Sequence, residues 1–195
     1  MGSGRTASAS SVSSPAVGRL FENRIVVWDV EASRTLFKEA YYGKPLGIPK
    51  PKDADFDAPL ILDLMEGYYL MKNKKLRVRG IDGKTLSMEK MEEICVRSYS
   101  DFGEKYLVYT RLKEAGFVVA PGIKFGSDFA VYEHGPGIDH APYIVQVEKS
   151  GALITATDMV RSGRLATTVR KQFIIAVANA EKGRVDFLAF DWWRA

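Results

Sequence analysis

The sequence predicts an α+β fold, with mixed α/β character in both halves and a division into two small domains. The chain has 195 residues, which is enough for one large domain or two small ones. Hydrophobic residues make up 46% of the chain and charged residues 27%, as in folded globular proteins. From Phe117 onwards, short apolar runs of β-rich composition dominate the sequence. We therefore expect the two domains to meet shortly before this residue.

The N-terminal part begins with a Ser-, Gly- and Ala-rich stretch. Residues 1–18 are expected to form a flexible tail, and the N-terminal α/β domain is expected to cover residues 19–105. A strand is predicted at Arg24–Val30, and the helical spacing that follows predicts a helix ending at Gly43. Four prolines exclude regular structure from Lys44–Pro59. A loop this long in a compact domain is usually functional or mobile.

The next segment is predicted to contain three helices and one strand. An amphipathic helix is predicted at Leu60–Lys75, and a strand with a sharp turn follows at residues 76–83. Ser87 is a suitable N-cap for the second helix. The third helix covers Asp101–Gly116, and its final glycine is a typical stop signal. This helix is expected to join the two domains.

The C-terminal domain, residues 106–195, is predicted to be rich in strands. Its one strong helix candidate is Ala156–Arg170. The β-rich runs cover residues 117–132, 143–148, 171–179 and 184–193. The last of these runs is apolar on both faces, as expected of a strand that is buried in an interface.

Charge and cysteine content restrict the class of protein. The formal net charge of +4 permits a polyanionic partner but does not require one. Cys95 is the only cysteine, so no internal disulfide can form, and we expect a buried structural thiol in a reducing cytoplasm. No apolar run reaches the roughly 18–20 residues of a membrane-spanning helix. We therefore expect a cytoplasmic protein without a membrane partner.

The two histidines, His134 and His140, raise the question of a metal site. A zinc site normally needs three or four ligands, and the sequence offers neither a third histidine nor a cysteine nearby. For a magnesium-dependent nuclease, the candidates are Asp128, Glu148 and Lys149. Glu148 and Lys149 are adjacent in a predicted strand and point to opposite faces. We expect no metal and no other cofactor, and a metal-dependent nuclease is the less favoured alternative.

Metal-free cleavage of RNA is a second kind of chemistry that these residues permit. The 2′-hydroxyl of RNA attacks the adjacent phosphate, so the enzyme needs a base, an acid and a cation. Histidine suits acid–base work because its pKa is near 6.5, and tyrosine can be a base where cations lower its pKa. Tyr132, His140 and Lys171 are available for these roles. Spacing alone does not select them from the other tyrosines and lysines.

Several separated motifs in this chain keep a definite order and spacing. They read KFG-x-DF-x-VY at residues 124–132, H-x-x-Y-x-V at residues 140–145 and R-x-x-x-x-VRK at residues 164–171. YYGKPLGI at residues 41–48 and KYLVYTRLKEAGFVVAPG at residues 105–122 precede them. Together these motifs resemble the archaeal tRNA-splicing endonucleases, in particular the catalytic subunit of the crenarchaeal two-subunit type. The resemblance covers nearly the whole chain after its first 20 residues.

The resemblance implies a C-terminal nuclease domain with a central mixed β-sheet flanked by helices. It implies that Tyr132 is the general base on the 2′-hydroxyl, His140 the general acid at the 5′-oxygen, and Lys171 the cation that stabilises the transition state. The products are then a 2′,3′-cyclic phosphate and a 5′-hydroxyl, formed without a metal. The implied substrate is precursor tRNA with a bulge-helix-bulge at the intron boundaries. His134 matches no motif position and is expected to be a loop side chain.

Further residues are expected to bind RNA. The resemblance implies that Arg164 and Trp192 hold a bulge base between them, and stacking of this kind contributes roughly 1–3 kcal/mol per base. The proline-rich loop contains a cluster of positive charge, formed by Lys44, Lys50 and Lys52. From this cluster we expect contacts with the RNA backbone or with a bulge.

The resemblance also implies an assembly of four protomer equivalents, joined by strand pairing at the C-terminus and by an acidic docking loop. The candidate for that loop, Val147–Leu153, carries one glutamate beside a lysine and departs from the family pattern. We expect self-association together with a second, structural subunit, which gives a heterotetramer. The alternative is a non-catalytic structural subunit or RNA-binding module of the same assembly, and the presence of all three catalytic residue types argues against it.

Overall fold

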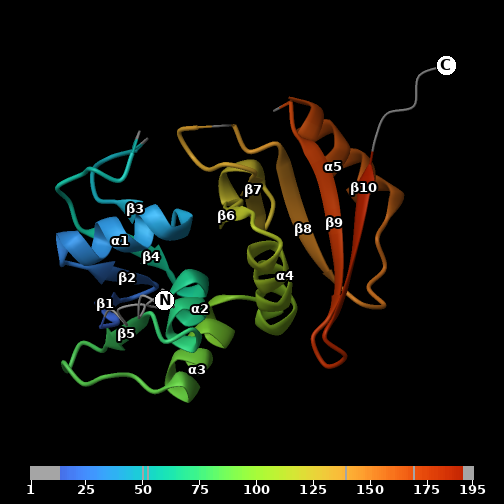
Figure 1. The fold of residues 1–195 in the computed structure, drawn as a ribbon. Coiled ribbons are helices and arrows are strands. Elements are labelled where there is room, and N and C mark those ends of the chain that lie inside the picture. The colour runs from blue at the N-terminus through green and yellow to red at the C-terminus, as the bar shows by residue number, and fades with distance from the viewer. Residues whose placement is uncertain (1–13, 50, 52, 139, 169, 191–195) are drawn as a thin grey trace, which may run out of the picture.

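The computed structural model describes residues 14–190, apart from residues 50, 52, 139 and 169. Within these residues the chain forms two five-stranded sheets, each with helices packed on it, and this confirms the predicted α+β fold. Helix α4 (Phe102–Glu114) lies between the N-terminal elements and the C-terminal sheet (Figure 1). No helix in the described part of the chain is long and apolar enough to cross a membrane.

The N-terminal sheet has the strand order β3-β4-β2-β1-β5. Neighbouring strands are antiparallel except for β1 and β5, which are parallel. Alternate residues such as Ile25, Leu62 and Val78 are fully buried on the face that the helices cover. The strands are β1 (Ala16–Phe21), β2 (Arg24–Val27), β3 (Lys44–Pro45), β4 (Leu60–Asp63) and β5 (Leu76–Arg79), and the helices are α1 (Val30–Ala40), α2 (Leu64–Lys72) and α3 (Met88–Ser98).

Strand β1 and the end of β2 depart from the predicted elements. Residues 16–18, which are expected in the tail, form the first half of β1 and pair with β5. The predicted strand ends at Val27 because Asp29 caps α1, where its carboxylate accepts from the backbone N–H of Ala32 at 2.8 Å. Helix α1 ends at Ala40, before the predicted stop at Gly43, because Tyr41 has a left-handed φ of 55°.

The helix predicted at Leu60–Lys75 is wrong over its first four residues. Leu60 and Leu62 are fully buried at alternate positions of β4, where they pair with β2. Asp63 then caps α2, because its side chain accepts from the backbone N–H groups of Met65 and Glu66. The helix therefore starts at the capping box and not at the first leucine.

Two other N-terminal predictions are wrong: Lys44 and Pro45 form the short strand β3 against β4, although no regular structure is predicted for Lys44–Pro59, and α2 ends at Lys72 and not at Lys75. Three local predictions are confirmed. Ser87 caps α3, with its hydroxyl accepting from the backbone N–H of Lys90 at 3.2 Å. Helix α4 ends at Glu114, and Gly116 follows with a φ of 89°. Cys95 is a buried free thiol, and burial raises its pKa to about 12. These residues are structural.

The C-terminal sheet has the strand order β10-β9-β8-β7-β6. All neighbours are antiparallel except β8 and β9, which are parallel and joined by a crossover through α5. The run predicted at residues 117–132 is interrupted by a short 3₁₀ turn and forms two strands. The elements are β6 (Val118–Pro121), η1 (Ile123–Phe125), β7 (Phe129–Tyr132), β8 (Tyr143–Lys149), α5 (Ala156–Thr168), β9 (Gln172–Asn179) and β10 (Arg184–Phe190).

One hydrophobic core cluster extends through both sheets. It includes Ile25 and Val78 from the N-terminal sheet, Val108 from α4, and Val145 and Ala178 from the C-terminal sheet. A smaller cluster lies on the opposite face of the C-terminal sheet, beneath α5, and contains Ile144, Phe173 and Ile175. Because the main core is shared, the N-terminal elements help to fix the position of the C-terminal sheet.

Candidate active site

Three strand ends meet at one edge of the C-terminal sheet. Val131 of β7 is in register with Tyr143 of β8, which is in register with Gln172 of β9. β7 runs antiparallel to β8, and β8 runs parallel to β9. The end of β7 and the starts of β8 and β9 therefore share an edge. Tyr132, the segment containing His140, and Lys171 all lie there, each within a few residues of this row.

Tyr132 and Lys171 lie on the same face of the sheet. Val131 packs in the core on the α4 face, so Tyr132, the next residue along the strand, points to the α5 face. The ammonium of Lys171 lies 4.9 Å from the centre of the Phe125 ring. Phe125 packs against the small cluster on the α5 face. The phenol and the ammonium can therefore approach one substrate group from this face.

The half-buried Lys171 also contacts the segment that contains His140. Its ammonium donates a hydrogen bond to the carbonyl oxygen of Ala141. Arg170, with a φ of 53°, makes the turn that leads into Lys171 from the end of α5. The lysine is thus held beside the residue that follows His140. An exposed flexible lysine at a helix end would not be fixed in this way.

His140 combines an exposed side chain with an anchored backbone. The histidine is exposed, whereas its neighbour Ala141 is only 3% exposed. The backbone N–H of Gln172 donates to the carbonyl of Pro142 at 2.8 Å and attaches the segment to the start of β9. The imidazole can therefore meet a ligand from solvent without a large movement of its backbone.

Tyr143 has a structural contact at this edge. Its hydroxyl donates to the carboxylate of Glu133 at 2.9 Å, and this hydrogen bond raises the pKa of Tyr143. The contact joins the start of β8 to the residue that follows Tyr132. Tyr143 therefore stays a neutral donor, while Tyr132 lies on the other face of the sheet.

The loop between Tyr132 and His140 lies against the N-terminal domain. A Cβ placed on Gly135 would lie 2.6 Å from the Tyr41 ring, and one on Gly137 would lie 2.7 Å from the carbonyl oxygen of Pro51. Both glycines have positive φ, 127° and 97°. Only glycine fits such a backbone at this separation. The sequence analysis did not predict this contact, which Gly-Pro-Gly at residues 135–137 could have indicated.

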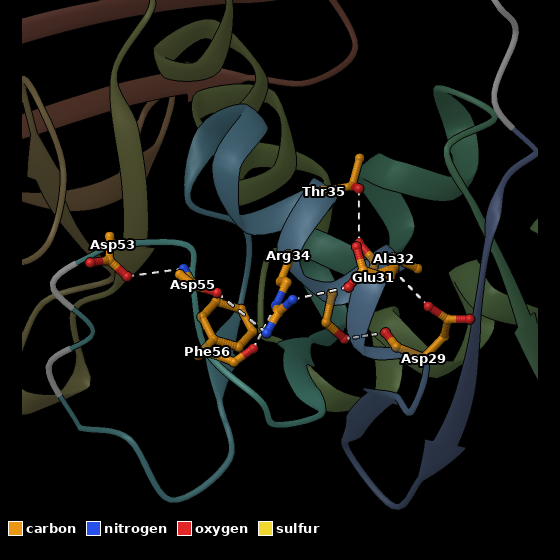
Figure 2. Close-up of polar contacts among 9 residues, drawn as sticks. Asp29, Glu31, Ala32, Arg34, Thr35, Asp53, Asp55 and Phe56 are labelled. Atoms are coloured by element: carbon orange, nitrogen blue, oxygen red, sulfur yellow. Dashed lines mark hydrogen bonds and ion pairs between the residues drawn. The ribbon is translucent and has the colours of Figure 1, made fainter.

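The proline-rich loop is anchored to α1 by Arg34. The Arg34 guanidinium donates to the carbonyl oxygen of Phe56 at 2.8 Å and forms ion pairs with Glu31 at 3.0 Å and Asp55 at 3.4 Å (Figure 2). The Phe56 ring packs edge-on against Phe37 of α1, with centroids 5.4 Å apart. The second half of the loop is therefore docked on the domain. Sequence reasoning did not identify Arg34, because no local pattern links it to a residue 22 positions away.

The other predicted RNA-binding residues are distributed over both domains. Arg164 is exposed on α5 and lines a shallow hollow with Ala156, Thr157 and Val160. Lys44 is exposed in β3. Lys50, Lys52 and Trp192 lie outside the described residues. His134 is exposed in the loop that precedes His140.

The carboxylates considered for a metal site have structural contacts. Asp128 forms an ion pair with Lys105 at 2.8 Å and accepts from the backbone N–H of Val147 at 2.8 Å. Burial, together with the neighbouring Asp128, raises the pKa of Glu148. In the described part of the chain, no three His, Cys, Asp or Glu side chains are grouped as metal ligands would be.

Comparison with known proteins gives matches over both halves of the chain. Residues 16–92 match the family model of the tRNA intron endonuclease N-terminal domain, and residues 102–187 match that of the tRNA intron endonuclease catalytic C-terminal domain. A tRNA-splicing endonuclease of Hyperthermus butylicus is 44% identical over 169 residues, covering 87% of this chain and 93% of the relative. Two others are 40% identical: that of Sulfurisphaera tokodaii covers 90% and 98% of the two chains, and that of Pyrobaculum aerophilum 91% and 99%.

Proposed function

Since the chain belongs to the tRNA-splicing endonuclease family and is an endonuclease, we propose that it excises introns from precursor tRNA by metal-independent cleavage at a bulge-helix-bulge. The products are a 2′,3′-cyclic phosphate and a 5′-hydroxyl. The observation that carries this proposal is the meeting of three strand ends at one sheet edge, where Tyr132, His140 and Lys171 lie together. A phenol, an imidazole and an ammonium are the groups that this reaction needs.

Each of the three residues has a defined role in the proposed reaction. Tyr132 takes the proton from the 2′-hydroxyl, whose oxygen forms a new bond to phosphorus. The bond from phosphorus to the 5′-oxygen breaks, and His140 gives its proton to that oxygen. Lys171 stabilises the negative charge that grows on the phosphate oxygens.

The position of Lys171 supports the role of Tyr132. A tyrosine has an ordinary pKa of about 10 and is a poor base at neutral pH unless nearby cations lower its pKa. Lys171 lies on the same face of the sheet as Tyr132, and its ammonium is fixed by the carbonyl oxygen of Ala141. The exposed His140 can reach the opposite side of the phosphate, where the leaving oxygen departs.

RNA recognition is assigned to residues around this edge and on the proline-rich loop. Arg164 is exposed on α5, the helix whose end leads into Lys171, which suits stacking on a bulge base with Trp192 as the second plane. Lys44, Lys50 and Lys52 are assigned to contacts with the RNA backbone or a bulge. The position of Lys44 supports this role, because it is exposed on β3, whose backbone is paired with β4, and a positioned cation binds at a lower cost in conformational entropy.

We further propose that the enzyme works in the cytoplasm as a heterotetramer with a second, structural subunit. Among the described strands, β10 lies at the edge of its sheet and pairs with β9 alone. Phe187 and Leu188 on this strand are 45% and 47% exposed. An apolar edge strand is suited to pairing with another chain. The buried Cys95, the single cysteine, is compatible with a reducing compartment.

One assay separates this proposal from its alternatives. The chain, alone and with its candidate partner subunit, is incubated in excess EDTA with a labelled bulge-helix-bulge RNA, and the product ends are analysed. We expect cleavage that leaves a cyclic phosphate. Activity that disappears with EDTA and returns with magnesium would identify a metal-dependent nuclease. Tight RNA binding without cleavage in either condition would identify a non-catalytic RNA-binding subunit.

A further inference from the structure

The N-terminal sheet has one face that the described helices leave uncovered. Gly67 of α2 lies so close to Ile25 that a Cβ there would be 2.1 Å from its Cδ1, so α2 packs on the Ile25 face. Leu36 and Phe37 of α1 belong to the same core. On the other face, Val17 and Phe21 of β1 are 43% and 42% exposed. This outer face is a sheet surface with exposed side chains on every described strand except β4, where Ile61 is half-buried.

The outer face is strongly cationic. The strands of this sheet carry five basic side chains and one carboxylate. That carboxylate, Asp63, accepts hydrogen bonds from the first turn of α2 and from the hydroxyl of Tyr99. Glu22, Asp29 and Asp82 also lie close to these strands in sequence, beyond the strand ends. All five basic residues are exposed, and they are Arg19, Arg24, Lys44, Arg77 and Arg79.

Three of these five cations lie in one row across the sheet. Strand register places Arg79, Arg19, Val26, Ile61 and Lys44 in one row across the sheet, in that order. With strands about 4.8 Å apart, four spacings give a row of about 19 Å. A row of this length can contact several phosphates of a nucleic-acid backbone. It also ends at Lys44, the residue assigned above to the RNA substrate.

Carboxylates of the described residues form no ion pair with these cations, although Asp63 is the cross-strand neighbour of Arg24. Among these residues, none of the five cations forms an ion pair with an acidic side chain. Arg19 instead donates to the carbonyl oxygen of Ile81 at 3.2 Å, and its guanidinium lies 5.7 Å from the Phe21 ring centre. Some cations elsewhere in this domain do form ion pairs, as Lys75 does with Glu39 and Lys90 with Glu93. Among the described residues, the five outer-face cations therefore have no acidic partner within ion-pair distance.

We propose that the outer face of the N-terminal sheet is a second RNA-binding surface. It binds the backbone of the precursor tRNA at a distance from the cleavage site. This inference rests on the proposed function, because RNA is the polyanion that the enzyme must hold. Arginine is well suited to phosphate, since its planar guanidinium donates two parallel hydrogen bonds. A protein partner would need an acidic surface to match these cations, whereas any RNA backbone supplies a phosphate at every nucleotide. The binding is to backbone and independent of base sequence.

The test compares two triple variants of the full chain, assembled with its partner subunit. One carries Arg19→Gln, Arg77→Gln and Arg79→Gln on the outer face. The control carries Lys38→Gln, Lys90→Gln and Arg97→Gln, which remove the same charge from exposed positions on α1 and α3. Two RNAs are used: a bulge-helix-bulge substrate and a continuous RNA stem without bulges. Dissociation constants are measured at several salt concentrations, and single-turnover cleavage is measured at saturating enzyme.

We expect the outer-face variant to bind both RNAs about tenfold or more weakly than the wild type. The slope of log affinity against log salt should fall by about 2–3, roughly one for each phosphate that the variant no longer binds. Cleavage at saturating enzyme should stay within about twofold of wild type, because the catalytic edge is untouched. The control variant should keep most of the affinity and of the salt slope.

Three outcomes would overturn the inference. They are an unchanged dissociation constant and salt slope, a decrease in affinity no larger than that of the control, or a failure to co-elute with the partner in size-exclusion chromatography. The last would make this face a protein interface. Failure of the proposed function is distinguishable, because the wild-type chain itself would then not leave cyclic phosphate ends on the substrate.

Discussion

Gly135 lies against the aromatic ring of Tyr41, at a separation where any side chain on the glycine would overlap the ring. The two residues are far apart in sequence. One belongs to the loop between the proposed base and acid, and the other follows α1 in the N-terminal domain. The contact explains how a loop rich in glycine can be held still. The histidine segment rests on the N-terminal domain as well as on the sheet that carries it.

We therefore expect Gly135→Ala to lower the single-turnover cleavage rate about tenfold or more, because the new methyl group must displace the loop or the ring. The φ of 127° at Gly135 lies outside the left-handed region that other residues adopt, so backbone strain adds to the overlap. Gly116→Ala is the control, since Gly116 has a φ of 89°, outside the left-handed region, and open space around it. It should lose some thermal stability and keep the wild-type rate. Tyr41→Gly also loses packing on Phe37, so the test is a double-mutant cycle: Gly135→Ala should cost less stability in the Tyr41→Gly background than in the wild type. An equal cost would show that overlap with the ring is not the cause.

The two histidines give a second prediction. His140→Ala should lower the cleavage rate by about 10²–10⁴, the usual contribution of a general acid, and leave RNA affinity within about threefold of wild type. His134→Ala should cleave within about twofold of the wild-type rate. Single-turnover kinetics with saturating enzyme measures both. A His140→Ala protein that cleaves at full rate would remove the proposed acid, and a reversed pattern would transfer the role to His134.

The anchor of the proline-rich loop gives a third prediction. Arg34→Ala removes the hydrogen bond to Phe56 and the ion pairs with Glu31 and Asp55, so it should lower the free energy of unfolding by about 1–2 kcal/mol. Limited proteolysis within the loop should become faster, and the substrate concentration for half-maximal rate should rise. Arg111→Ala is a suitable control, because it removes an exposed pair with Glu114 and a hydrogen bond to the carbonyl oxygen of Gly183, neither of which involves the loop. Equal protease sensitivity in the two variants would show that Arg34 does not hold the loop.

Local signals predicted most helices correctly but were less informative for short strands. Ser87 and Gly116 mark helix ends through their own chemistry, so they could be identified from the sequence. Leu60 and Leu62 belong to a four-residue strand, which is too short for its alternation to be distinguished from the start of a helix. Strand β1 adjoins a Ser- and Gly-rich stretch, and its pairing partner β5 lies more than 50 residues away.

The candidate site depends on contacts that the sequence does not encode locally. Val131, Tyr143 and Gln172 form one row only because β7, β8 and β9 are neighbours in the sheet. Chemical reasoning from the sequence could name a phenol, an imidazole and an ammonium, but only the resemblance to a family selected Tyr132, His140 and Lys171. Their meeting at one edge is a property of the topology. The support from Tyr41 and Arg34 depends on the fold in the same way.

The buried carboxyl group of Glu66 gives a prediction about pH. Glu66 is 6% exposed, and its oxygens accept from the backbone N–H groups of Gly43 at 2.8 Å and Asp63 at 2.9 Å. Burial, with a further contribution from the charge of Asp63, raises the pKa of Glu66 from 4.5 to about 8. Between pH 4.5 and 8, Glu66 of the folded protein therefore keeps a proton that the unfolded chain has released.

The raised pKa of Glu66 makes the folded state less stable as pH increases. Its contribution is fully present below about pH 4.5 and is lost as pH rises through about 8. Burial lowers the pKa of Lys113 to about 8, so Lys113 makes the folded state more stable as pH rises above 8. The loss of stability from Glu66 is therefore measured below pH 8. We expect the free energy of unfolding to fall by on the order of 2–4 kcal/mol between pH 5 and 8.

Glu66→Gln should flatten this slope, and Glu181→Gln, at an exposed turn, should keep it. Urea unfolding at each pH measures the slopes, and equal slopes in the wild type and Glu66→Gln would exclude Glu66 as the titrating group.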